Sequence, residues 1–103
     1  MKGESNILLL KEIQKKIEPV AKEYGVEKVY LFGSYARKEA DDNSDVDLRI
    51  DKGLIRGLDL VGFIYDVESA LGKNVDVVTT KSLGDDFLQI IKSEEVLLYE
   101  SRQ

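Results

Sequence analysis

The chain contains no cysteine and no histidine among its 103 residues. Without cysteine, disulfides and thiolate metal sites are excluded, and a cytoplasmic location is favoured. Without histidine, the usual general base and the commonest zinc ligand are absent, so carboxylates must carry any acid–base or metal chemistry. The longest apolar run, Ile7–Leu10, is far too short for a membrane span or a secretory signal. We therefore expect no membrane association.

Positive charge is also scarce, because 20 acidic residues outnumber 15 basic ones and the net charge is −5. Direct binding to nucleic acid normally requires a basic face, so a broad nucleic-acid groove is not expected. A nucleotide could still bind locally through a metal ion and backbone donors. The length suits one domain with one core, which we expect to span residues 1–103.

Hydrophobic spacing predicts alternating helices and strands. The expected elements are a helix over 6–24 capped by Ser5 or Asn6, strands over 27–32 and 46–50, a helix over 58–71, a strand over 74–79, a short helix over 85–92 and a short strand or tail over 96–99. Pro19 is expected to kink or divide the first helix near Glu18. Residues 35–39 could start a helical turn, and the stripe containing Tyr65 and Leu71 is expected in the core. These elements predict a small α/β (α+β) domain with a mixed, mostly antiparallel sheet and helices mainly on one face.

Two motifs stand close together in the middle of the chain. Gly33-Ser34 ends the first predicted strand, and after a ten-residue spacer Asp45 and Asp47 flank Val46. Side chains alternate along a strand, so the two carboxylates point to the same face, where they repel each other unless a cation neutralises them. A hard divalent ion such as Mg²⁺ suits oxygen ligands and phosphates, and a glycine turn lets a phosphate approach the backbone. The glycine turn and the two aspartates together predict a site for a metal-bound nucleoside triphosphate.

A third carboxylate, Asp76, interrupts an apolar run in the last long strand. We expect an unpaired carboxylate there to be costly to desolvate. If this strand lies beside the Asp45–Asp47 strand, the three carboxylates can form the cluster that two-metal phosphoryl transfer uses.

Each motif also has a plainer interpretation. Gly33-Ser34 could be an ordinary turn, and Asp45 and Asp47 could be solvated residues on an edge strand. Arg37 could contact phosphates, but an ion pair with Glu39 or with the aspartates is at least as reasonable.

Three segments together carry a family resemblance: Leu31–Arg37, Ser44–Leu48 and Val75–Val78. They resemble the minimal nucleotidyltransferases of the DNA polymerase β superfamily, and within that group the antitoxins of HEPN/MNT toxin–antitoxin pairs. The resemblance covers nearly the whole chain. Lys38 departs from it, because the family usually has glycine after Ala-Arg.

The resemblance implies that Gly33 and Ser34 hold the β- and γ-phosphates of ATP. It implies that Asp45 and Asp47 bind two Mg²⁺ ions, and that Asp76 binds the catalytic ion and helps deprotonate an acceptor hydroxyl. In similar antitoxins the acceptor is a tyrosine of the partner HEPN ribonuclease toxin, which adenylylation inactivates.

Two other functions stay open at this point: transfer to a small molecule, and neutralisation of a toxin by steric cover without catalysis. A chain this short has no room for a domain that holds the acceptor, which favours a protein partner and predicts an exposed apolar patch where it docks.

Overall fold

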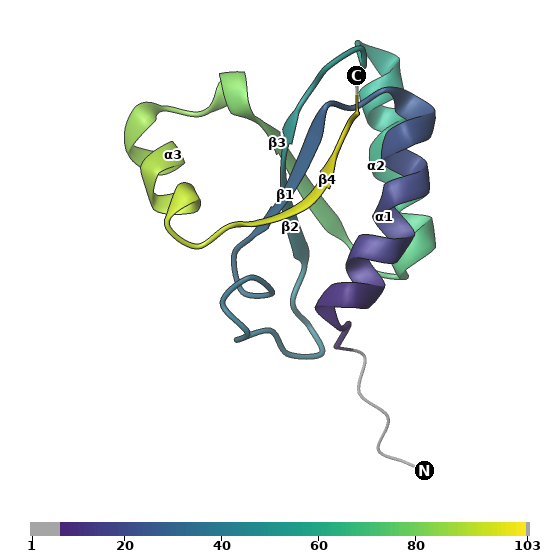
Figure 1. The fold of residues 1–103 in the computed structure, drawn as a ribbon. Helices are drawn as coiled ribbons and strands as arrows, with labels where there is room; N and C mark the ends of the chain where they lie inside the picture. The colour runs from purple at the N-terminus through teal and green to yellow at the C-terminus, as the bar shows by residue number, and fades with distance from the viewer. Residues whose placement is uncertain (1–6, 103) are drawn as a thin grey trace.

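The computed structural model describes residues 7–102, which form a four-stranded sheet and three α-helices (Figure 1). In chain order the elements are α1 (Leu10–Tyr24), β1 (Lys28–Phe32), β2 (Val46–Asp51), α2 (Leu58–Leu71), β3 (Val75–Thr79), the 3₁₀ helix η1 (Thr80–Ser82), α3 (Asp85–Lys92) and β4 (Val96–Glu100). The predicted helices and strands are confirmed; most of their bounds agree, and apart from the start of the first helix the others are shifted by one residue. None of the helices in this part of the chain is long and apolar enough to cross a membrane.

The strand order is β3-β2-β1-β4, with β1 antiparallel to β2 and β4, and β3 parallel to β2. The mixed, mostly antiparallel sheet is thus confirmed. Antiparallel pairing sets Phe32, the end of β1, opposite Asp47 near the start of β2, and parallel pairing sets Asp76 beside Asp47. The three motif-bearing segments therefore meet at one end of the sheet, as expected.

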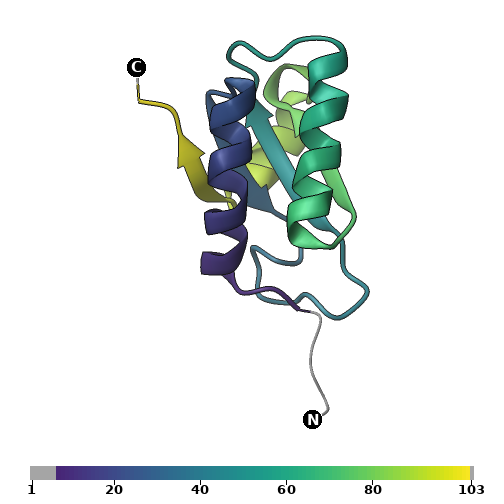
Figure 2. The same cartoon turned by 90° about the vertical axis from the view of Figure 1, so that its right-hand side faces the viewer.

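Helices α1 and α2 lie side by side on one face of the sheet, and α3 lies on the other (Figures 1 and 2). The side chains of β2 alternate between these two faces of the sheet. Val46, Leu48 and Ile50 are buried in the core with α1 and α2, which turns Asp47 and Arg49 toward the α3 face. The face that carries the carboxylates is therefore only partly covered by helix.

Helix α1 begins at Leu10 rather than at residue 6, so the predicted start is wrong; the predicted caps Ser5 and Asn6 lie outside the described residues. Of the two effects expected of Pro19, a kink or a division, division is wrong, because α1 is continuous through this residue. A proline in a helix interior costs about 3 kcal/mol. Full burial of Ile13 and Ile17 contributes about 1.5–3 kcal/mol each, which is enough to keep the helix intact.

Helix α2 buries only part of the stripe that was expected in the core. Phe63, Val67 and Leu71 are in the core, whereas Tyr65 is 68% exposed, so its assignment to the core is wrong. The helix is apolar on more than one side, and spacing alone does not tell which side meets the sheet. The outward side presents Tyr65 together with Val61 as large exposed apolar side chains, in line with the predicted apolar patch.

Candidate active site

The chain turns sharply after β1 and folds against the carboxylate of Asp47. Gly33 has φ 77°, and a Cβ atom on it would lie 2.1 Å from Oδ2 of Asp47, so a larger residue would be strained and would have to displace the carboxylate or the turn. The Arg37 N–H donates to the Gly33 carbonyl (3.0 Å), and the Glu39 N–H donates to the Ser34 carbonyl (2.8 Å). Residues 33–39 thus form a series of hydrogen-bonded turns, which we call the Gly33 loop, rather than the helical turn expected from 35–39.

The three predicted carboxylates lie at the same end of the sheet. Asp47 and Asp76 are register partners on β2 and β3, and Asp45 immediately precedes β2. Burial raises the pKa of Asp47 to about 6, with further contributions from the charges of Asp76 and Asp45, a hydrogen bond with Asp76 and an opposing effect of Arg37. Asp76 itself is exposed, so the expectation that it is the desolvated carboxylate is wrong. Asp47 has that environment instead.

The chemistry of this group fits a hard divalent cation. Its donors are carboxylate oxygens on or next to strands, and the charge repulsion that raises the pKa of Asp47 is what a cation relieves. Within residues 7–102, however, no three acidic side chains converge closely enough to form a preassembled metal site. The location and donor type fit Mg²⁺, and a cation would have to draw the side chains together.

Arg37 is an ion-paired side chain, which was one of the two interpretations of the sequence. Its Nε donates to Oε1 of Glu39 (3.0 Å), and its Nη1 lies 3.1 Å from both carboxylate oxygens of Glu94. Oε2 of Glu94 also accepts the Gly33 N–H at 2.7 Å. Glu94 lies between α3 and β4, and no motif in the sequence pointed to it.

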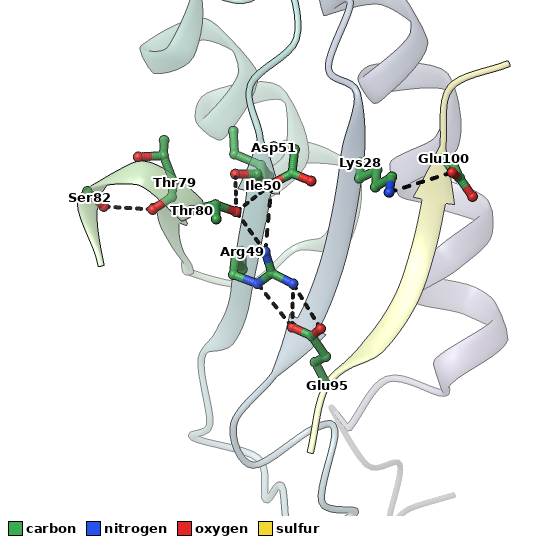
Figure 3. A network of polar contacts seen from close by, with 9 residues as sticks. All are labelled: Lys28, Arg49, Ile50, Asp51, Thr79, Thr80, Ser82, Glu95 and Glu100. Atoms are coloured by element: carbon green, nitrogen blue, oxygen red, sulfur yellow. Dashed lines mark hydrogen bonds and ion pairs between the residues drawn. The ribbon is translucent and has the colours of Figure 1, made fainter. Parts of the chain in front are cut away.

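A second group missing from the sequence analysis surrounds Arg49, which is only 3% exposed (Figure 3). Its Nη2 donates to both oxygens of Glu95 (2.8 Å each), its Nη1 donates to Oγ1 of Thr80 (2.7 Å), and its Cζ lies 4.0 Å from the ring centre of Tyr30. This network ties the α3–β4 turn to the sheet beside the carboxylates. The sequence signal that could have pointed to Arg49 is the alternation of side chains along β2, which puts Arg49 on the same face as Asp47.

Lys38, the residue that departs from the family pattern, has φ 62° and is the one non-glycine residue with a positive φ in the described chain. This left-handed conformation costs an L-residue about 1–2 kcal/mol and costs glycine little. The structure thus gives a physical reason for glycine at this position, and the turn forms with lysine as well.

Comparison with known proteins agrees with this geometry. The family model "Polymerase beta, Nucleotidyltransferase" matches residues 15–103. A relative from Methanocaldococcus jannaschii named "Putative protein adenylyltransferase MJ0435" is 43% identical over 75 residues, which are 72% of this chain and 81% of the relative. The protein adenylyltransferase MntA of Thermococcus cleftensis is 33% identical over 98 residues, covering 87% of this chain and 96% of the relative.

Solved structures share the fold. One is the complex of tri-AMPylated Shewanella oneidensis HEPN toxin with MNT antitoxin, which matches with a TM-score of 0.68 at 20% identity over 90% of this chain and 74% of the solved chain. At that identity the likeness concerns the fold alone. The sequence match, the glycine loop and the carboxylates at one end of a mixed sheet lead to one conclusion: the chain belongs to the polymerase beta nucleotidyltransferase family.

Proposed function

We propose that this protein is an antitoxin that transfers AMP from ATP to a tyrosine of a HEPN ribonuclease toxin and thereby neutralises it. The observation that carries nucleotidyl transfer is the direct packing of the Gly33 loop against Asp47, with Asp76 as the register partner of Asp47. The protein acceptor is supported by the similarity to MntA, which extends over 96% of that adenylyltransferase.

In the proposed reaction each residue has a defined part. Asp45, Asp47 and Asp76 would hold Mg²⁺, which when bound supplies charge neutralisation at the triphosphate. The backbone of Gly33 and Ser34, with Arg37 nearby, would hold the β- and γ-phosphates through N–H donors and positive charge.

The acceptor oxygen would attack the α-phosphorus, forming a P–O bond while the bond from the α-phosphorus to the bridging oxygen breaks and pyrophosphate leaves. Asp76 is exposed, so its carboxylate could accept the hydroxyl proton and release it to water. With no histidine in the chain, positioning and electrostatics must provide most of the acceleration.

A protein acceptor also agrees with the surface. Large apolar side chains are exposed on α2 at Leu58, Val61 and Tyr65, at helical spacing along one side of the helix. An apolar stripe of this kind is a common feature of protein-binding surfaces.

The test is to co-express this protein with the product of its neighbouring gene, to purify both, and to measure the intact mass of the second protein after incubation with Mg²⁺ and ATP. We expect a gain of one or more AMP units. Asp45→Asn/Asp47→Asn should abolish the gain while the complex still forms.

The matched control is Asp59→Asn/Asp86→Asn, which removes the same charge from exposed positions on α2 and α3 and should leave the gain unchanged. A tight complex that neutralises the toxin with no change of mass would refute the enzymatic function and favour steric neutralisation.

A further inference from the structure

The side chain of Glu94 occupies the donors that would bind phosphate. Its Oε2 accepts the Gly33 N–H at 2.7 Å, and both of its oxygens lie 3.1 Å from Nη1 of Arg37. The side chain of Glu94 is 19% exposed, so these contacts are partly shielded from water. A carboxylate with one short backbone N–H bond and one guanidinium partner has the contacts expected of a phosphate oxygen.

The backbone around Glu94 is held firmly, which keeps this carboxylate close to the Gly33 loop. The N–H groups of Glu94 and Glu95 both donate to the carbonyl of Ile91, at 3.0 and 2.9 Å. Glu95 forms the bidentate pair with the buried Arg49 on the sheet. The Glu94 side chain can therefore leave the Gly33 loop by rotating, without any movement of α3 or β4.

We propose that Glu94 is an intramolecular competitor for the triphosphate, a proposal that rests on the proposed function of the Gly33 loop. Two anions cannot share the Gly33 N–H and Arg37, because they repel each other and each donor hydrogen can serve only one of them well. The triphosphate carries more charge and offers more acceptor oxygens than one carboxylate, so it displaces Glu94. A nucleoside monophosphate has no β- or γ-phosphate to place there and leaves Glu94 bound.

A consequence is weaker binding of every nucleotide whose phosphates reach the Gly33 loop. The tethered carboxylate has a high effective concentration at the Gly33 loop and weakens every ligand that needs those donors. Removing the charge of Glu94 should therefore tighten ATP binding and leave AMP binding nearly unchanged.

The experiment is isothermal titration calorimetry of the full chain with ATP in the presence of Mg²⁺, and in parallel with AMP. For Glu94→Gln we expect ATP affinity to rise about tenfold, which is near the lower end of the effect of one charge-assisted hydrogen bond. Glu94→Asp keeps the charge but withdraws it by one methylene. The ATP affinity of this variant should therefore lie between those of the wild type and Glu94→Gln.

The matched control is Glu39→Gln. Glu39 pairs with the same Arg37 at 3.0 Å but does not accept the Gly33 N–H, and its side chain is 64% exposed. Its replacement should change ATP affinity by less than about twofold, because exposed ion pairs contribute little. An equal gain in this variant would mean that general charge near Arg37 matters rather than occupation of the phosphate position, and the proposal would fail.

A direct readout is the amide proton of Gly33 in a ¹⁵N-correlated NMR spectrum, which should shift upfield in Glu94→Gln and also move when ATP binds the wild type. Unchanged or weaker ATP binding by a folded Glu94→Gln variant would overturn the proposal and make Glu94 a support of the Gly33 loop. In that case ATP binding by the wild type would still support the proposed function. If no folded variant, wild type included, binds ATP, the proposed function and this inference both fail.

Discussion

Gly33 and Asp47 are packed so closely that a Cβ atom on residue 33 would lie 2.1 Å from Oδ2 of the aspartate. The glycine turn and the carboxylate of Asp47 are therefore one structural unit, although they are 14 positions apart in the chain. The turn shields Asp47 from water on one side, which agrees with burial as the largest cause of its raised pKa.

Replacing Gly33 by alanine should abolish transfer, because the methyl group must displace either the Gly33 loop or the carboxylate. A misplacement of about 1 Å at a reacting centre can cost about 10²-fold in rate. The control is Gly72→Ala, since Gly72 has φ 69° but open space around its Cβ position. Both variants should lose about 1–2 kcal/mol of unfolding free energy from backbone strain, but only Gly33→Ala should lose activity. Equal activity of the two would contradict the close packing.

Asp47 should make the protein less stable as the pH rises. Its pKa is raised from 3.8 to about 6 in the folded state, so the native chain binds more protons than the unfolded chain between these values. The unfolding free energy should fall as the pH rises from about 4 to 6 and then level off. Asp47→Asn should remove this dependence of the unfolding free energy on pH. It should also stabilise the protein at pH 7.5 by about 1 kcal/mol, a figure that includes a reduction for the partial exposure of the carboxylate. Urea unfolding in EDTA measures both; a less stable variant at pH 7.5 would be the opposite result.

Mg²⁺ should offset the loss of stability that the ionised carboxylate of Asp47 causes. A cation held by the carboxylates binds the folded state and raises its stability by mass action. The melting temperature of the wild type should therefore rise with Mg²⁺ concentration, whereas Asp45→Asn/Asp47→Asn should show no such rise. Thermal unfolding followed by circular dichroism is sufficient, with Asp59→Asn/Asp86→Asn as the control that should respond like the wild type. Identical responses of all three proteins would exclude the aspartates as ligands.

Lys38→Gly should stabilise the fold. The φ of 62° costs lysine about 1–2 kcal/mol, and the greater freedom of glycine in the unfolded chain removes part of the gain. We expect a net increase of about 0.5–1 kcal/mol, or about 3–6 °C in melting temperature. Lys52→Gly is the control, because Lys52 is an exposed loop lysine without positive φ and should lose stability when replaced. A loss in Lys38→Gly would show that its side chain has a role of its own.

Removing only one member of the Arg49–Glu95 ion pair should lower the stability of the protein more than removing both. Glu95→Ala leaves a buried guanidinium without its bidentate partner, which should cost about 3 kcal/mol or more of unfolding free energy. Arg49→Met/Glu95→Met removes both charges and should recover most of that loss. Denaturant unfolding of the single and double variants makes the comparison. A double variant no more stable than Glu95→Ala would mean that the hydrogen bond to Thr80 matters more than the unpaired charge.

Local patterns in the sequence were enough for the fold class, the order of elements and the family. The carboxylates Asp45, Asp47 and Asp76 and the turn at Gly33 are identified by residue type and spacing, and strand alternation alone puts Asp45 and Asp47 on one face. These features depend on neighbours within about a dozen residues, which a linear sequence records directly.

Other features depend on packing between distant segments, and only the tertiary structure decides them. The sheet selects Phe63 rather than Tyr65 as the buried side of α2, because both sides of that helix are apolar. The Gly33 loop buries Asp47 and leaves Asp76 exposed, which reverses the expected desolvation. Glu94 reaches Gly33 across 61 positions of chain, and Glu95 reaches Arg49 across 46. Charged pairs of this kind form when two elements meet in space, and neither member shows in the sequence which partner it will find.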